Sequence, residues 1–285
     1  MPERPHATLA TRAGLRTITT AVRLLGPLRD PVASAIGAMW YLKQPARVRE
    51  RDARNHRRLA PNLRPAQARR LARVSYRSYV RMIFDGIWAD PLPVRAVRDI
   101  VHVDGAERVA TGTGILITSH FGNWDIGASG AMSLGLRMTT VMAPIGSRAL
   151  TAMVALSRAR KGFELYTPEQ AARGLIRGLR TGRWVGLMAD VPEAGPTVVV
   201  PFCGGRVRAS AVPARLAAAT GAAIVPTACW KEGRRWNLRI HAAITVGRHD
   251  DEADVMSRVV AVLEPEIRRH PEQWYPFHEV YEDAA

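Results

Sequence analysis

The segment 118–125 reads TSHFGNWD and places a histidine, His120, five positions before an aspartate, Asp125. An imidazole accepts a proton near neutral pH, and a carboxylate that faces it fixes its tautomer and stabilises the imidazolium. Such a pair is equipped for general-base catalysis, which is worth about 10²–10⁴ in rate. The sequence around His120 holds no Gly-x-Ser-x-Gly elbow, so it favours direct base catalysis over a covalent intermediate.

The sequence on either side of His120 predicts a strand followed by a helix. Residues 115–119 form a short apolar, β-branched run typical of a buried strand. Asn123 can cap a helix over 123–134, and the start of that helix favours an ionised Asp125. His120 then leaves the carboxyl end of a strand, where open α/β sheets bind ligands. A histidine and an aspartate also occur close together in loops without catalytic roles, but the small neighbours of His120 and the glycine Gly122 favour a site.

The remaining chain alternates apolar strand patterns with helical ones. Further strands are predicted at 138–142, 185–189, 197–201, 223–228 and 236–240, and helices at 148–160, 168–181, 210–220 and 252–270. This alternation predicts an α/β fold with a mixed, mostly parallel central sheet flanked by helices, preceded by an amphipathic helical segment. We expect residues 1–88 to form a basic, membrane-associating helical segment packed on a core of residues 89–285, with one structural domain overall.

Positive charge is concentrated in one part of the chain. The net charge is +16, and residues 43–81 contain thirteen Lys or Arg residues against two acids. Such a stripe suits an anionic membrane surface or nucleic acid. No helix-turn-helix, RNP-type or zinc pattern accompanies it, so we expect no nucleic-acid partner.

The residues before the basic stripe support the membrane interpretation. Residues 15–42 mix apolar and basic side chains, and Gly-Pro at 26–27 and Asp-Pro at 30–31 divide them into two short helices. The aromatic residues Trp40 and Tyr41, close to the basic stripe, are typical of a lipid–water interface. The alternative, an amphipathic helix that packs on its own domain, stays open.

No stretch is long and apolar enough to predict a transmembrane helix, which needs about 18 or more residues, and no secretory signal is apparent. The two cysteines, Cys203 and Cys229, are far apart in apolar surroundings and suggest inert thiols in a reducing compartment. We therefore expect a peripheral protein on the cytoplasmic face of the cell membrane.

Several ordered blocks resemble one protein family. They are HFGNWD at 120–125, RNHRRL at 54–59, GLMAD at 186–190 followed by PFCGG at 201–205, LAAATGAAIVP at 216–226, and HPEQWY at 270–275. Taken in chain order, these blocks resemble those of the bacterial lysophospholipid acyltransferase superfamily. More narrowly, they resemble the branch that contains lipid A late acyltransferases and actinobacterial phosphatidylinositol mannoside acyltransferases.

The resemblance implies transfer of an acyl group from acyl-CoA or an acyl carrier protein to a hydroxyl of a membrane glycolipid or phospholipid. His120 would be the base and Asp125 its orienting partner. The mannoside acyltransferases place a further carboxylate before the PFCGG-like block, where this chain has the apolar residues 198–200. Glu193 and Asp190 lie upstream of these residues and could supply a substitute carboxylate, but only if their loop folds back over His120.

Other residues are candidates for substrate contact. Arg158, Arg160 and Lys161 end a predicted helix beside a glycine and suit the phosphates of a thioester donor, although basic residues also favour helix C-termini in general. We expect Arg206 and Arg208 on the acceptor side. The full substrate-binding set is Asn123, Trp124, Arg158, Arg160, Lys161, Asp190, Arg206 and Arg208, and the candidates for an acyl trough are Phe84, Ile87, Trp88, Trp124 and Met142.

We expect no metal site and no cofactor apart from the thioester substrate. Three alternatives stay open: acylation of a soluble specialised metabolite, hydrolysis of the thioester by water, and a catalytically inactive relative that binds membranes.

Overall fold

The computed structural model describes residues 12–145, 147–191 and 195–282. Its strands are β1 (Val101–Asp104), β2 (Gly114–Thr118), β3 (Met138–Val141), β4 (Glu164–Tyr166), β5 (Trp184–Met188), β6 (Thr197–Phe202), β7 (Gly205–Ser210), β8 (Ala223–Glu232) and β9 (Arg235–Ile240). Its α-helices are α1 (Arg12–Leu24), α2 (Arg29–Lys43), α3 (Ala46–Leu59), α4 (Pro65–Ala89), α5 (Trp124–Ser133), α6 (Arg148–Arg160), α7 (Ala171–Arg180), α8 (Val212–Thr220) and α9 (Glu252–Arg269).

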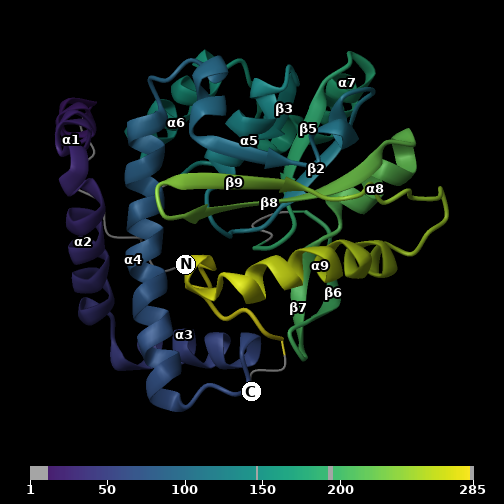
Figure 1. Cartoon of the computed structure of the whole chain (residues 1–285). Helices are drawn as coiled ribbons and strands as arrows, with labels where there is room; N and C mark the ends of the chain where they lie inside the picture. Colours follow the sequence, from purple (N-terminus) through teal and green to yellow (C-terminus); the bar gives the residue numbers. More distant parts are fainter. Residues whose placement is uncertain (1–11, 146, 192–194, 283–285) are drawn as a thin grey trace.

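The described strands form a seven-stranded sheet in the order β1-β9-β8-β2-β5-β3-β4. Adjacent strands are parallel except for β8 and β9, which form an antiparallel pair. β6 and β7 form a separate antiparallel hairpin that packs on α9 (Figure 1). The predicted α/β class with a mostly parallel sheet is confirmed. The strand expected at 197–201 exists, but it lies in this hairpin and not in the central sheet.

Helices cover both faces of the sheet because β2, β5 and β8 are apolar on both sides. Ile115, Ile117 and Val185 pack in one buried cluster beneath α7, α8 and α9. Leu116 and Met138 point to the opposite face and pack in a second cluster beneath α5. β2 therefore runs through the centre of a three-layer structure (Figure 1).

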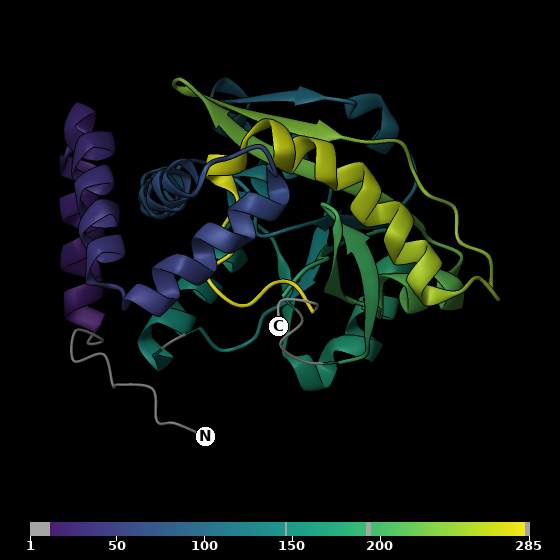
Figure 2. The same cartoon turned by 90° about the horizontal axis from the view of Figure 1, so that it is seen from below.

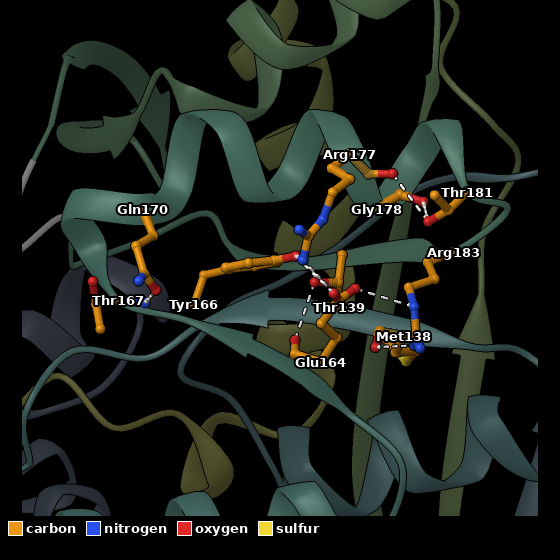
Figure 3. Close-up of polar contacts among 10 residues, drawn as sticks. All are labelled: Met138, Thr139, Glu164, Tyr166, Thr167, Gln170, Arg177, Gly178, Thr181 and Arg183. Carbon is orange, nitrogen blue, oxygen red and sulfur yellow. Dashed lines mark hydrogen bonds and ion pairs between the residues drawn. The ribbon is translucent and has the colours of Figure 1, made fainter.

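The edge strand β4 is only three residues long and is held by polar contacts (Figure 3). The Tyr166 hydroxyl donates a hydrogen bond to the Glu164 carboxylate at 2.7 Å, and Arg177 and Arg183 lie 2.8 and 3.1 Å from the same carboxylate. Thr139 of β3 donates to the Glu164 carbonyl at 3.0 Å. The hydrogen bond from Tyr166 and the two arginines hold the pKa of Glu164 below its usual range. This network secures an edge that backbone pairing alone supports weakly.

The amino-terminal helices stand beside the sheet, with α4 next to the core and α1 and α2 outside it (Figures 1 and 2). Gly37 of α2 lies directly against the backbone of α4, where a Cβ would meet the Tyr76 carbonyl oxygen at 2.5 Å. An ionic cluster joins these helices to the sheet: the buried Asp85 of α4 contacts Lys231 of β8 at 2.7 Å and Arg29 of α2 at 3.0 Å. Over the described residues, no helix has the length and apolar character needed to cross a bilayer.

The aromatic residues expected at a lipid–water interface take a different place. Tyr41 is 6% exposed and meets Tyr76 edge to face. Trp40 packs against Tyr76 and Phe277. Trp40 therefore joins α2 to α4 and to the carboxyl-terminal segment, and Tyr41 joins α2 to α4. Burial of ring area in these contacts is more favourable than its exposure to water.

Candidate functional site

His120 and Asp190 meet at the carboxyl edge of the sheet, two residues beyond a pair of neighbouring strands. β2 and β5 are parallel and in register, with Thr118 opposite Met188. The backbone continues for two residues beyond each of these strand positions, so His120 and Asp190 lie side by side. The His120 Nδ1 lies 3.0 Å from the Asp190 Oδ1, and the His120 backbone N–H lies 3.0 and 2.9 Å from the two carboxylate oxygens.

Asp190 is poised to remain ionised. Burial alone raises its pKa, but the charge of His120 and the hydrogen bonds that His120 donates outweigh burial and hold the pKa of Asp190 below its usual range. An ionised carboxylate at Nδ1 keeps the proton on that nitrogen and leaves the lone pair on Nε2. The side chains of His120 and Asp190 are 33% and 28% exposed, so solvent and substrates can reach the pair.

Asp125 has a different partner from the one that the spacing predicts. Among the described residues, its carboxylate takes its side-chain hydrogen bonds from Arg158, whose Nε and Nη2 lie 2.9 and 3.2 Å from the two oxygens. Asp125 lies in the first turn of α5, and Arg158 lies in the last turn of α6. Local spacing predicts Asp125 as the partner of His120, but among the described residues the carboxylate at the His120 Nδ1 is that of Asp190.

The loop between β2 and α5 is fixed by backbone contacts. Gly122 has a φ of +59°, and a Cβ at this position would lie 1.7 Å from the Cys229 carbonyl oxygen. Its N–H donates to the Gln273 carbonyl at 2.8 Å, and the Tyr275 N–H donates to the His120 carbonyl at 3.3 Å. Only glycine combines this dihedral with so close a backbone neighbour.

Asn123, expected among the substrate contacts, makes its polar contacts inside the protein. It is 1% exposed. Its side-chain oxygen caps α5 by accepting from the Ile126 N–H at 3.0 Å, and its amide donates to the Met82 carbonyl at 3.1 Å. Both polar groups of this side chain are therefore used inside the protein, as the predicted helix cap requires.

A cavity of about 340 Å³ opens beside His120 and runs between α5 and one face of the sheet. Its lining is predominantly apolar and includes small residues of α5 together with the sheet residues Leu116, Met138, Gly186 and Leu238, closed by Phe163. His120, Trp124, Asp125 and Arg158 also line it.

Two of the residues proposed for an acyl trough, Trp124 and Met142, line this cavity. The other three, Phe84, Ile87 and Trp88, are not among its lining residues. The cavity thus lies on the sheet side of α5, whereas three of the trough candidates belong to α4.

Apart from Arg206, the cations expected to bind substrate have acidic partners or lie partly inside the protein. Arg160 pairs with Asp90 at 2.9 Å, and Arg208 pairs with Glu282 at 2.8 Å. Burial lowers the pKa of Lys161. Arg206 is exposed on β7. Glu193, expected to assist His120, lies outside the described residues.

No sequence pattern predicts a role for His278, which lies near Asp190. His278 lines a second, smaller cavity together with Asp190 and Ser119. Burial lowers the pKa of His278, while the nearby Asp190 carboxylate acts in the opposite direction. His278 follows His120 by more than 150 residues, so no local spacing could link them. Among the described residues, no group of three or more His, Cys, Asp or Glu side chains is arranged to hold a metal ion.

Comparisons with known proteins match most of the chain. The model of the family described as bacterial lipid A biosynthesis acyltransferase matches residues 9–282. The phosphatidylinositol mannoside acyltransferase of Mycobacterium tuberculosis is 31% identical over 186 residues, which cover 64% of this chain and 58% of that protein. The protein of the same description from Mycolicibacterium smegmatis is 29% identical over 183 residues, 63% of this chain and 60% of that protein. The match therefore spans less than two thirds of the length of these relatives.

Among solved structures, the 1-acyl-sn-glycerophosphate (LPA) acyltransferase PlsC of Thermotoga maritima aligns with 93% of this chain and 100% of its own, at 13% identity and a TM-score of 0.43. The family match over residues 9–282 confirms the resemblance carried by the sequence blocks: this chain belongs to the bacterial lipid A biosynthesis acyltransferase family.

Proposed function

We propose that this chain transfers a fatty acyl group from an acyl thioester, either acyl-CoA or an acyl carrier protein, to a hydroxyl of a membrane glycolipid or phospholipid. The observation that carries the proposal is the His120–Asp190 pair at the mouth of an apolar cavity. Membership of an acyltransferase family and the similarity to proteins described as phosphatidylinositol mannoside acyltransferases support the same reaction class.

In the proposed mechanism His120 is the general base. With the Nδ1 proton held by Asp190, Nε2 accepts the proton of the acceptor hydroxyl while the hydroxyl oxygen attacks the thioester carbonyl carbon. The tetrahedral intermediate collapses, the carbon–sulfur bond breaks, and the departing thiolate takes the proton from the imidazolium. The Asp190 carboxylate stabilises the positive charge that His120 carries between these two proton transfers.

The cavity under α5 is the proposed site of the acyl chain. It begins at His120, so a chain lying within it would hold the thioester carbon at the base. Each methylene group that leaves water for such a surface contributes about 0.8 kcal/mol, which makes a long chain a source of donor affinity. The bidentate Arg158–Asp125 pair at the same mouth supplies polar groups for the acceptor.

The proposed place of this reaction is the cytoplasmic face of the cell membrane, with residues 1–88 as the associating segment. A lipid acceptor resides in the bilayer, and the excess of arginine in residues 43–81 favours an anionic surface.

The test is thiol release from palmitoyl-CoA with and without added lipid extract, using the unchanged protein, His120→Ala and the control His102→Ala, an exposed histidine on β1. We expect release that needs both His120 and lipid and that survives the control substitution. Release that needs His120 but ignores lipid would indicate hydrolysis or a soluble acceptor. Equal release by the unchanged protein and His120→Ala would refute the catalytic proposal.

A further inference from the structure

The proposed acyl transfer places negative charge on the carbonyl oxygen of the thioester. When the acceptor hydroxyl attacks, the electrons of the C=O bond move to this oxygen, and a hydrogen-bond donor aimed at it is often the largest single contribution to catalysis. His120 receives the proton of the acceptor in this step, so a different group has to stabilise the oxygen. That group has to come from the lining of the cavity that begins at His120.

The segment that leads to His120 presents alternate side chains to the two faces of the sheet. Leu116, Thr118 and His120 line the cavity under α5, whereas Ser119 lines the smaller cavity on the face that α9 covers. This alternation is that of an extended chain, in which residues two positions apart point the same way and have Cα atoms at most about 7 Å apart. Thr118 therefore shares the cavity face with the imidazole and lies next to it.

Three threonines line this cavity, and two of their hydroxyls are used by the backbone. Thr140 donates to the Gly186 carbonyl at 2.7 Å, and Thr227 donates to the Ile117 carbonyl at 3.2 Å. Among the described residues, the Thr118 hydroxyl has no such acceptor, and the residue is partly exposed. A hydroxyl in an apolar lining costs free energy unless it is hydrogen-bonded. Thr118 therefore offers a donor that a bound substrate can use.

The backbone of Thr118 is fixed at the point where β2 ends. Its carbonyl accepts a hydrogen bond from the Ala189 N–H at 2.7 Å, and Thr118 pairs in register with Met188 of β5. Ala189 immediately precedes Asp190, so the same segment after β5 fixes Thr118 and orients His120. A donor that is already in place needs no reorganisation when charge develops on the substrate, which makes it effective.

We infer that the Thr118 hydroxyl donates a hydrogen bond to the thioester carbonyl oxygen as this oxygen becomes negative. The inference rests on the proposed function and names a second catalytic residue for it. The acceptor oxygen lies about 3 Å from Nε2 of His120 and about 3 Å from the carbonyl carbon in a reactive complex, so the carbonyl oxygen lies beyond them, within reach of a residue next to the base. Thr118 keeps its proton throughout. The C=O bond forms again when the carbon–sulfur bond breaks and the thiolate takes the proton from His120.

Thiol release from palmitoyl-CoA by Thr118→Val, with lipid extract present, tests the inference, because valine keeps the branching of the side chain and removes the hydroxyl. We expect kcat to fall about 100-fold with little change in KM, as for the loss of one donor that acts on the transition state. Thr118→Ser keeps a hydroxyl and should restore most of kcat. Thr140→Val is the matched comparison: it removes a hydroxyl that already serves the Gly186 carbonyl, so it should lower thermal stability more than kcat.

Binding of hexadecyl-CoA, a thioether that lacks the carbonyl, separates catalysis from folding. We expect the unchanged protein and Thr118→Val to bind it equally, and weaker binding by Thr118→Val that accounts for its loss of turnover would overturn the inference. Equal kcat for the unchanged protein and Thr118→Val would overturn it as well and leave the proposed function standing. In that case a loss of kcat in Trp124→Phe would assign the donor to the indole N–H, whose ring lies 5.0 Å from that of His120. No thiol release by the unchanged protein would refute the proposed function and this inference together.

Discussion

Replacing Asp190 with asparagine is the sharpest test of how His120 is oriented. Asparagine keeps the size of the side chain and can still accept a hydrogen bond from the His120 backbone, but it removes the negative charge. The structure therefore predicts a loss of imidazolium stabilisation with little change in the fold.

The magnitude follows from the distance between the two groups. At 3.0 Å, Coulomb's law gives about 5.5 kcal/mol with an effective dielectric constant of about 20, and about 1.4 kcal/mol in water. His120 and Asp190 are each roughly a third exposed, so a value near 3 kcal/mol, between the two limits, applies. A barrier higher by about 3 kcal/mol lowers kcat roughly 100-fold.

The assay is steady-state thiol release from palmitoyl-CoA, with kcat and KM measured separately across the pH range. We expect the loss in kcat and little change in KM, because Asp190 contacts the proposed base His120 and does not line the proposed acyl cavity. Asp125→Asn is the comparison: it removes the same charge near His120 but leaves the contact at Nδ1 intact.

Two results would refute this reasoning. One is an Asp190→Asn protein with unchanged kcat beside an Asp125→Asn protein that has lost turnover, which would return the orienting role to Asp125. The other is a loss of thermal stability that accounts for the whole effect of Asp190→Asn, which would make Asp190 a purely structural residue.

Three further predictions concern the surroundings of the site. In a double-mutant cycle of Asp125→Asn and Arg158→Gln, urea unfolding should give a coupling free energy of about 1 kcal/mol. This value is at the upper end of the coupling energies of partly exposed ion pairs. A coupling of zero would contradict the bidentate contact. Gly186→Val puts side-chain atoms beside the Met138 methyl group in the cavity. It should slow palmitoyl-CoA turnover about tenfold and spare short-chain donors, because the cavity then lacks room for about two methylene groups. An equal loss of turnover for all chain lengths would argue against this cavity as the acyl site. Burial lowers the pKa of His56 to about 3. As the pH falls below about 6.5, the unfolded state therefore binds a proton at this residue that the folded state does not bind. The free energy of unfolding should drop by about 2 kcal/mol between pH 7 and pH 5 for this reason. His56→Gln should remove that part of the pH dependence in chemical denaturation, and an identical slope in both proteins would show that other groups cause it.

The strands and helices of the core were largely predictable because their apolar patterns are strong. The helix predicted at 148–160 is observed with the same bounds, and the strand predicted at 115–119 is observed one residue earlier. β4 was missed because it is a three-residue edge strand held by side chains, and β1 was missed because its four residues alternate with the polar His102 and Asp104. Short edge strands carry too few residues for periodicity to identify them.

The candidate site shows a similar division. The histidine and its strand-to-helix setting were visible in the sequence, since both depend on neighbouring residues. Asp190 was predicted only as a substitute carboxylate near His120, because its place at Nδ1 depends on the order of strands, which puts the residues that follow β5 beside those that follow β2. A local aspartate was therefore assigned the contact that tertiary structure gives to a distant one.

The backbone contacts that fix the His120 loop also constrain when the site can form. Gly122 and His120 bond to the backbone of Gln273 and Tyr275, some 150 residues further along the chain. At a synthesis rate of about 5–20 residues per second, those partners leave the ribosome roughly 8–30 s after the histidine. The carbonyls of Pro276 and Phe277 in turn accept hydrogen bonds from Asn55 and Arg51 of α3, so the same segment also packs on a helix that precedes it in the chain. A nascent chain therefore cannot complete the backbone contacts that hold the His120 loop until residues 273–275 have been synthesised.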